Sequence, residues 1–303
     1  MTEKKFWKLG IIGWPLGYSL SPVMHHAALK ASGLQGEYLE YKVKPEDLEN
    51  WLLTVAPTLD GFNVTMPYKE GLYLWMQDTS ESRKAVLSQV AAQMRAVNTV
   101  VVRDGGFAGD NTDGIGFVNS LNEKIPAGFD DKKVLVFGAG GAARAVIWAL
   151  LTKHSGKRMR IYLYNRDAKK AADLCAQMTA AKPAECHSEI QVCSNEERNE
   201  ALQFDLIVNT TPVGMNPGEG PLFDYGQLRP GQIVYDIVYK PKETPLVQAA
   251  NSRACIVITG DEMLAGQGAA AFELWTGVPA AKTLPVMKKA LDEHFAHREK
   301  AQA

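Results

Sequence analysis

The amino-acid sequence predicts an α/β protein with two domains, one built on a mixed sheet and one on a doubly wound parallel sheet. Short apolar runs rich in Val and Ile alternate with helical patterns, which is typical of strands joined by helices. This alternation is interrupted after Asp113 and starts again at Lys133. A chain of 303 residues is also long enough for two domains of ordinary size.

The first domain is expected to span residues 1–114. Its first helix should have Ser21 as the N-cap and Pro22 at the first helical position, because these residue types favour helix starts. A second helix should start at Pro45, and helical patterns cover residues 68–94. The predicted strands are residues 8–13, 38–43, 61–67 and 96–102. Strands separated by such helices predict a parallel or mixed sheet covered on both faces.

The second domain is expected to span residues 115–264. Its predicted strands are residues 133–138, 160–165, 189–194, 204–211, 231–238 and 254–260, with helices over residues 140–154 and 167–180. Residues 262–277 and 280–300 form two further amphipathic helical patterns. We expect residues 265–303 to pack back onto the first domain and complete it.

Composition excludes several classes of function. The formal net charge is −1 and the basic clusters are short, so no nucleic acid or anionic membrane is expected as a partner. The four cysteines lack zinc-type spacing, which predicts no metal and favours reduced thiols in a cytoplasmic protein. The apolar run near the N-terminus breaks within a few residues, so neither a signal peptide nor a membrane-spanning segment is expected.

The segment "VLVFGAGGAARAV" carries the pattern G-x-G-x-x-A, formed by Gly138, Gly140 and Ala143, between a predicted strand and a predicted helix. The first glycine permits a tight turn, the second lets a pyrophosphate approach, and the small third residue lets helix and strand close up. Amide groups at the helix start then face the phosphates. The pattern predicts a Rossmann-type dinucleotide site, against the alternative of a glycine-rich turn without a ligand.

The next predicted strand ends in "YNRD", where an NAD enzyme usually has an acidic residue for the ribose hydroxyl. Asn165 stands there instead, followed by Arg166, with Lys169 and Lys170 close behind. Cations around a ribose 2′-phosphate favour NADP, whereas the carboxylate of Asp167 would repel that phosphate. The alternative is a solvated helix start with Asp167 as its N-cap.

Near the carboxyl ends of predicted strands in the first domain, where open α/β sheets bind ligands, stand four polar residues: Asn63, Thr65, Asn98 and Asp113. Hydride chemistry at a carbonyl needs a proton for the developing alkoxide. Lys69 in "GFNVTMPYKE" is the candidate acid–base, and Asp113 in "GDNTDG" is its candidate partner. The alternatives are a surface lysine paired with Glu70 and a helix N-cap at Asp113.

Ser19 and Ser21 stand at the start of the first predicted helix, where they could cap it or donate to a carboxylate. A pocket of hydroxyl and amide side chains without an arginine cluster suits a small polyhydroxylated substrate better than a phosphorylated one.

The sequence resembles the shikimate dehydrogenase family, including its quinate/shikimate members, through short motifs in the family's order. These motifs are "GWPLGYSLSP", "GFNVTMPYKE", "AVNTVV", "GDNTDG", "GAGGAARA", "YNRD", "NTTPVGM", "YDIVYKP" and "GQGAAAFELWTG". The resemblance implies a discontinuous substrate domain, an NADP-binding Rossmann domain and an active site in the cleft between them. It also implies reversible NADP-dependent reduction of 3-dehydroshikimate to shikimate in the aromatic amino acid (chorismate) pathway.

Roles for individual residues follow from the resemblance. Lys69 and Asp113 would be the catalytic pair. The substrate carboxylate and ring hydroxyls would contact Ser19, Ser21, Thr65, Asn98, Tyr239 and Gln267. The cofactor would contact Gly138, Ala139, Gly140, Gly141, Ala142, Asn165, Arg166, Asp167, Lys170, Ile237 and Gly260.

Two residues depart from the family pattern. Tyr18 stands where the family often has His, and Asp167 stands where NADP-specific members usually have Thr. The second departure keeps dual NAD and NADP use open, so the alternative is a quinate/shikimate dehydrogenase. Two more distant alternatives are a catalytically silent nucleotide-binding module, which would not need Lys69 and Asp113, and a dehydrogenase of folate-type one-carbon units. The Ser19/Ser21 pair and "NTTPVGM" favour the shikimate interpretation over the second of these. Monomer and homodimer both stay open.

Overall fold

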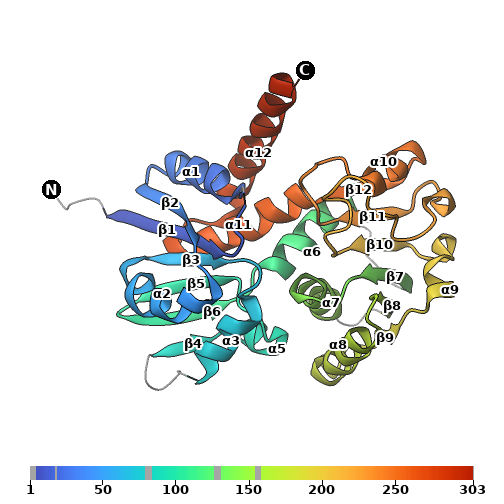
Figure 1. The fold of residues 1–303 in the computed structure, drawn as a ribbon, viewed down its shortest axis with the longest axis horizontal. Helices are drawn as coiled ribbons and strands as arrows, with labels where there is room; N and C mark the ends of the chain where they lie inside the picture. Colours follow the sequence, from blue (N-terminus) through green and yellow to red (C-terminus); the bar gives the residue numbers. More distant parts are fainter. Residues whose placement is uncertain (1–4, 18, 79–83, 126–130, 154–157, 303) are drawn as a thin grey trace. The chain divides into compact units, whose positions relative to one another are not determined.

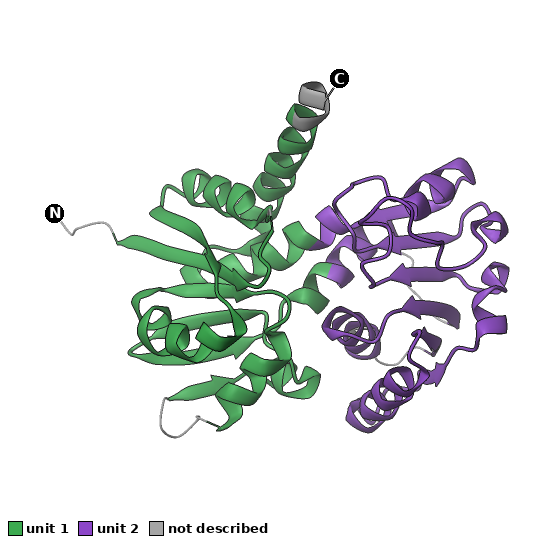
Figure 2. Ribbon diagram, viewed as in Figure 1, with its two compact units in different colours: residues 1–116, 264–303 green, residues 117–263 purple. Residues whose placement is uncertain are grey.

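The computed structural model describes residues 5–17, 19–78, 84–125, 131–153 and 158–302, so Tyr18 lies outside the described residues. The chain divides into two compact units (Figure 2). Unit 1 consists of residues 1–116 and 264–303, and unit 2 of residues 117–263. Each unit is a sheet with helices packed on it (Figure 1), which confirms the predicted α/β class.

Unit 1 contains a six-stranded mixed sheet in the order β2-β1-β3-β5-β6-β4. Its strands are β1 (Phe6–Gly13), β2 (Gln35–Lys42), β3 (Gly61–Val64), β4 (Ala85–Leu87), β5 (Thr99–Arg103) and β6 (Gly106–Asp110). The β3–β5 and β5–β6 pairs are antiparallel, whereas the other pairs are parallel. Two strands were not predicted: β4 lies in a segment with helical patterns, and β6 is a short glycine-containing return strand.

Helices cover both faces of this sheet. They are α1 (Ser21–Ala31), α2 (Leu48–Thr54), α3 (Lys69–Asp78), α5 (Gln89–Met94), α11 (Gly260–Thr276) and α12 (Ala280–Gln302), with 3₁₀ turns η1 (Pro45–Asp47) and η2 (Ala56–Thr58). On one face, Trp51 of α2 packs edge-on against Phe62 of β3. On the other, Trp275 of α11 packs beside Tyr38 of β2. A Cβ on Gly61 would lie 2.3 Å from the Trp275 ring, so glycine lets α11 close onto the sheet.

Unit 2 contains a six-stranded sheet in the order β12-β11-β10-β7-β8-β9, and every pair is parallel. Its strands are β7 (Lys132–Phe137), β8 (Met159–Tyr164), β9 (Glu189–Val192), β10 (Leu206–Asn209), β11 (Ile233–Asp236) and β12 (Ile256–Thr259). The strand order reverses between β7 and β10, so this is the predicted doubly wound sheet. Such sheets bind ligands at the carboxyl ends of the strands near the reversal.

The helices of unit 2 also lie on both faces of its sheet. They are α6 (Asp113–Lys124, its first residues in unit 1), α7 (Gly141–Lys153), α8 (Ala168–Ala181), α9 (Asn195–Arg198) and α10 (Pro245–Ser252), with 3₁₀ turns η3 (Ala201–Gln203) and η4 (Tyr225–Gln227). Val234 of β11 shares a buried cluster with Leu246 of α10. The adjacent Tyr235 faces the other way, where its hydroxyl lies 2.6 Å from Ser120 Oγ of α6.

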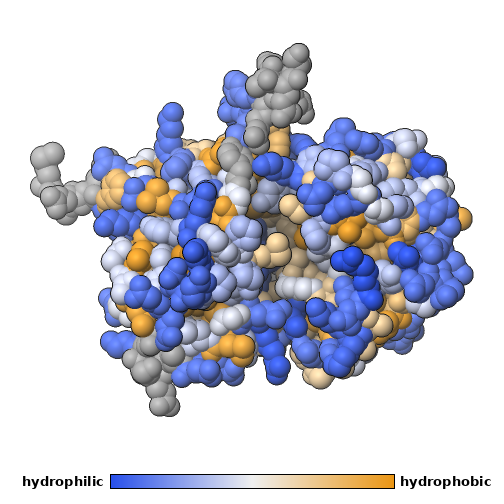
Figure 3. Space-filling model, in the orientation of Figure 1, coloured by the Kyte–Doolittle hydropathy of each residue, from blue (hydrophilic) through white to orange (hydrophobic). Residues whose placement is uncertain are grey.

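The surface of both units is mostly hydrophilic in the view of Figure 3, with apolar residues scattered among the polar ones. Among the described helices, none has the length and apolar character needed to cross a membrane.

Candidate active site

Lys69 and Asp113 form an ion pair in unit 1. Lys69 is the first residue of α3, and Asp113 is the first residue of α6. Lys69 Nζ lies 2.5 Å from Asp113 Oδ2, and the two side chains are 21% and 8% exposed. The structure therefore brings together the two residues that the sequence singled out, and the partner of Lys69 is Asp113 rather than Glu70.

Asn98 holds the other oxygen of the Asp113 carboxylate. It is buried and lies directly before β5, so the expected position near the carboxyl end of a strand is wrong for this residue; β5 runs antiparallel to β3, which brings its amino end to the site. Asn98 Nδ2 donates to Asp113 Oδ1 at 2.8 Å and to Thr112 Oγ1 at 3.2 Å. Its Oδ1 accepts from the Thr112 amide at 2.8 Å. Each Asp113 oxygen thus has its own donor, which fixes the plane of the carboxylate. Thr112 was not predicted, although it lies inside the "GDNTDG" motif.

Gln267 extends this cluster, and Thr65 is placed separately by its position after β3. Gln267 of α11 lies beside Thr112, whose Oγ1 donates to Gln267 Oε1 at 3.5 Å. Gln267 Nε2 donates to the Leu264 carbonyl at 3.1 Å. Thr65 is half-buried directly after β3, and its amide donates to the Ile12 carbonyl at 3.0 Å.

The two predicted serines lie together at the start of α1. The Ser21 amide donates to Ser19 Oγ at 3.2 Å. The prediction that Ser21 is the N-cap is wrong: Leu20, with helical dihedrals, occupies that position and Ser21 is already the first helical residue. The Ser19 amide donates to Glu40 Oε1 of β2 at 3.1 Å. Nothing in the sequence pointed to Glu40, because the contact joins residues on different elements.

In unit 2, the turn between β7 and α7 has the geometry that the glycine motif predicts. Gly138 has a φ of +104°, and a Cβ there would lie 2.5 Å from Thr210 Oγ1, so only glycine fits. A Cβ on Gly140 would meet nothing within 4 Å, so the backbone faces open space. Since α7 begins at Gly141, its first amides have no acceptor within the helix. These features fit a bound pyrophosphate.

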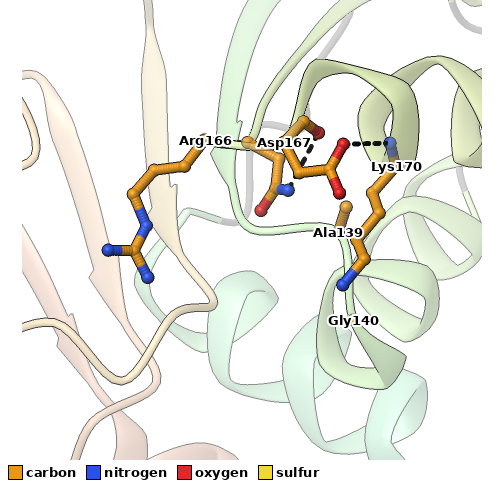
Figure 4. A pocket seen from close by; sticks show the side chains of 6 residues that line it. Ala139, Gly140, Arg166, Asp167 and Lys170 are labelled. Atoms are coloured by element: carbon orange, nitrogen blue, oxygen red, sulfur yellow. Dashed lines mark hydrogen bonds between the residues drawn. The ribbon is translucent and has the colours of Figure 1, made fainter.

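A pocket of about 370 Å³ adjoins this turn (Figure 4). It is lined by Ala139, Gly140, Asn165, Arg166, Asp167 and Lys170. In Figure 4 the Lys170 side chain extends toward Gly140, while the Arg166 guanidinium points away from Asp167. Gly141 and Ala142 form the first turn of α7. The pocket therefore combines an open glycine turn with two cations, which fits a phosphorylated adenosine ribose.

Asp167 is the N-cap of α8, as the alternative interpretation of "YNRD" proposed. Its Oδ1 accepts from the amides of Lys169 at 3.0 Å and Lys170 at 3.2 Å. Asn165 Nδ2 donates to the Asp167 carbonyl at 3.0 Å. The carboxylate thus occupies amides at the helix start that could otherwise bind an anion.

Ile237, Tyr239 and Gly260 lie at the carboxyl ends of β11 and β12. A Cβ on Gly260 would lie 2.0 Å from the Ile237 carbonyl oxygen, so the two backbones can approach only because this residue is glycine. The Ile237 amide donates to the Asn209 carbonyl at 3.1 Å. Tyr239 is half-buried, and burial raises the pKa of its hydroxyl.

Asp236 is a buried residue that sequence reasoning missed. Its carboxylate accepts from Asn209 Nδ2 at 2.9 Å, the Val238 amide at 3.0 Å and Thr244 Oγ1 at 2.6 Å. Burial, only partly offset by these bonds, raises the pKa of Asp236 to about 6. The network ties together the loops after β10 and β11. Its one sequence signal is an acidic residue in the apolar run "IVYDIV".

No metal site is evident in the described part of the chain, where no three His, Cys, Asp or Glu side chains gather.

Comparison with known proteins identifies the family. Residues 11–100 match the family described as "Shikimate dehydrogenase substrate binding domain", residues 120–211 "Shikimate / quinate 5-dehydrogenase", and residues 260–291 "Shikimate 5'-dehydrogenase C-terminal domain". The chain is 41% identical over 291 residues to the shikimate dehydrogenase (NADP(+)) of Moorella thermoacetica, covering 93% of both chains.

Solved structures show the same similarity. A shikimate dehydrogenase in complex with NADP+ has a TM-score of 0.83 and 34% identity, covering 97% of this chain and 98% of that one. The shikimate 5-dehydrogenase of Thermus thermophilus, solved with NADP(H) and shikimate, has a TM-score of 0.75 and 31% identity, covering 94% and 99%. With matches along both units, the chain belongs to the shikimate dehydrogenase family.

Proposed function

We propose that this protein is a shikimate dehydrogenase, which catalyses the reversible NADP-dependent reduction of 3-dehydroshikimate to shikimate. The observation that carries the proposal is the Lys69–Asp113 pair, with Asn98 on the second carboxylate oxygen. An ammonium held in one place by a carboxylate can give a proton to a carbonyl oxygen and take it back in the reverse direction.

NADPH supplies the hydride when it is bound, and residues of the protein donate the proton and bind and orient the substrate. Lys69 Nζ donates a proton to the oxygen of the substrate carbonyl as that carbon becomes an alcohol carbon. Asp113 holds the Lys69 ammonium and contacts the neighbouring hydroxyl. The Ser19 and Ser21 hydroxyls bind the substrate carboxylate. Further ring contacts are proposed for Thr65, Asn98, Gln267 and Tyr239. The fixed positions of these groups restrict the substrate to a reactive orientation.

The cofactor is proposed to lie along the β7–α7 turn of unit 2, with its pyrophosphate on the amides of residues 138–142. Lys170 and Arg166 would attract the ribose 2′-phosphate, with Asn165 beside them. Ile237 and Gly260 would lie beside the nicotinamide. These assignments are supported by the open space at Gly140 and by the cations of the adjoining pocket.

One observation favours NAD as a second cofactor. The Asp167 carboxylate stands at the start of α8, on the wall of the pocket proposed for the ribose phosphate. A negative charge there weakens the attraction for a phosphate but not for a hydroxyl. Quinate stays an alternative substrate, and the assay below tests it beside shikimate.

A cytoplasmic location is proposed because the four cysteines are unpaired thiols. Every site residue of the proposal comes from a single chain, so it is compatible with a monomer or a homodimer.

The test is a matrix of shikimate and quinate, each with NADP and NAD, followed by the absorbance of the reduced cofactor. Shikimate with NADP should give the highest kcat/KM. Lys69→Met removes the ammonium but keeps the aliphatic chain, and should lower kcat by at least about 100-fold. Lys289→Met is the matched control, since Lys289 is an exposed lysine paired only with Glu293 of its own helix. Near-normal turnover by a folded Lys69→Met protein would contradict the proposed mechanism.

A further inference from the structure

Tyr38, Asn63 and Thr99 form a series of buried hydrogen bonds that leads to Asn98, the residue that holds Asp113. These three residues are here called the buried polar chain. Tyr38 Oη donates to Asn63 Oδ1 at 2.8 Å. Asn63 Nδ2 donates to Thr99 Oγ1 at 3.1 Å and to the Asn98 carbonyl at 3.2 Å. Thr99 Oγ1 donates to Asn98 Oδ1 at 2.9 Å. The chain ends on the residue that holds Asp113.

These residues occupy positions where apolar side chains would normally lie. Tyr38 is 1% exposed, Asn63 4% and Thr99 0%. Their neighbours are rings: His25 stacks on Tyr38 with a centroid distance of 4.3 Å, and Trp275 packs beside both. Burying polar groups costs free energy unless each is paired, and an apolar core of the same shape is often no less stable. A fully paired polar chain in such a core is therefore better explained by orientation than by stability.

The direction of each hydrogen bond is determined by its partners. Asn63 accepts the Tyr38 proton through Oδ1, so its Nδ2 must be the atom that faces Thr99. Thr99 accepts there and has one proton left. Asn98 Oδ1 at 2.9 Å is the nearer acceptor for that proton, and Thr112 Oγ1, which can itself donate, lies at 3.2 Å. With Oδ1 of Asn98 turned to Thr99, only Nδ2 can face Asp113, and a carboxylate oxygen needs a donor.

We propose that Thr99 is a positioning residue for the Lys69–Asp113 pair, acting through the amide of Asn98, and that Asn63 and Tyr38 set the direction of its hydrogen bond. The proposal rests on the function proposed above, because it takes Lys69 and Asp113 as the catalytic pair. Without the Thr99 hydroxyl, Asn98 Oδ1 loses one of its donors and depends on Thr112, whose backbone amide donates at 2.8 Å, so the Asn98 side chain is held less firmly. A shift of this side chain would move Nδ2 away from Asp113 Oδ1 and displace the carboxylate that holds Lys69.

Two substitutions of the same residue separate positioning from packing. Thr99→Val keeps the shape and removes the hydroxyl, whereas Thr99→Ser keeps the hydroxyl and removes the methyl group. We expect Thr99→Val to lower kcat/KM for shikimate by about 10- to 100-fold, the range for a small misplacement of a reacting group. Thr99→Ser should stay within about threefold of the wild type. If Thr99 served only packing in this core, the serine variant would be the more impaired of the two.

Thr283→Val is the matched control, because Thr283 is also fully buried in unit 1 and its hydroxyl bonds only within α12. Its kcat/KM should be unchanged even if its thermal stability falls. Tyr38→Phe keeps the ring packing and removes the first donor of the chain, so a fall of about threefold to tenfold is expected. This variant carries the test if Thr99→Val fails to fold.

The outcomes separate the two proposals. Wild-type turnover by Thr99→Val, or by Tyr38→Phe where Thr99→Val does not fold, would overturn the positioning role. Greater loss in Thr99→Ser than in Thr99→Val would overturn it as well. If Lys69→Met and Asp113→Asn abolish turnover in the same assays, the proposed function stands whatever the Thr99 variants do. If those two variants stay active, the function proposal fails first.

Discussion

Asp236 should make unit 2 less stable as the pH rises, and Asp236→Asn should remove this dependence. The carboxyl has a pKa of about 6 in the folded protein, against 3.8 for an ordinary aspartate. Because the pKa is raised on folding, the stabilising contribution is fully present below the unfolded value and is lost as the pH rises through the folded value. A difference of about two pKa units corresponds to a stabilising contribution of about 3 kcal/mol in total. Of this contribution, about 2 kcal/mol is lost as the pH rises from about 4.5 to 7.5.

The substitution can keep the surrounding contacts. The amide oxygen would accept from Asn209 and Val238, as Oδ1 does now. The amide nitrogen would donate to Thr244, whose hydroxyl can turn to accept. The expected result is therefore a change in charge with little change in packing. Relative to the wild type, Asp236→Asn should gain about 2 kcal/mol in the free energy of unfolding between the two pH values.

Hydrogen-exchange mass spectrometry on peptides from β10 and β11 measures this gain within unit 2, once the intrinsic pH dependence of exchange is divided out. The comparison uses the difference between the two proteins, so titration of other groups cancels. Parallel stability profiles for Asp236→Asn and the wild type would refute the reasoning, because the carboxyl would then ionise as readily in the folded chain as in the unfolded one.

Three further predictions concern other parts of unit 2. Gly260→Ala would place a Cβ 2.0 Å from the Ile237 carbonyl oxygen, so the free energy of unfolding should fall by about 3 kcal/mol and NADPH titration should show weaker binding. Unchanged stability and affinity would show that the loop after β11 can move away from the added methyl group. Asp167→Ser keeps a helix cap but removes a negative charge, so KM for NADP should fall about threefold to tenfold while KM for NAD stays the same. Equal changes of KM for both cofactors would mean that the Asp167 carboxylate lies away from the ribose phosphate. Burial raises the pKa of the Cys193 thiol to about 12, so iodoacetamide should label it in mass spectra only after unfolding; rapid labelling of the native protein near pH 8 would contradict this.

Parts of this fold were predictable because they depend on short segments. The turn at Gly138 requires a glycine for local reasons, and the strand and helix beside it have clear periodicity. The pairing of Lys69 with Asp113 was also within reach, because carbonyl reduction needs an acid–base group with a partner and each residue lies in a short recognisable motif, "GFNVTMPYKE" and "GDNTDG". The secondary structure around Gly106 was not, because β6 becomes a strand by antiparallel pairing with β5 rather than by its own composition.

The contacts of the site that were missed share a different property. Glu40 contacts Ser19 across 21 positions of sequence, and the buried polar chain links Tyr38 to Asn63 and Thr99 from three separate strands. No periodicity or motif records which buried side chains meet after the sheet forms. The prediction that Ser21 caps α1 was wrong for a local reason: serine favours the cap position, but Leu20 before it already has helical dihedrals. Local preference was outweighed by the path of the chain into α1.

The interrupted order of unit 1 along the chain has a consequence for its synthesis. Trp275 fills the core beside His25, and its indole Nε1 donates to the Val100 carbonyl at 2.9 Å, yet it follows all of unit 2 in the sequence. On the ribosome, unit 2 can complete its parallel sheet while one face of the unit 1 sheet still lacks α11 and α12. The unit that contains the first strand to emerge is therefore the last to become resistant to protease in the nascent chain.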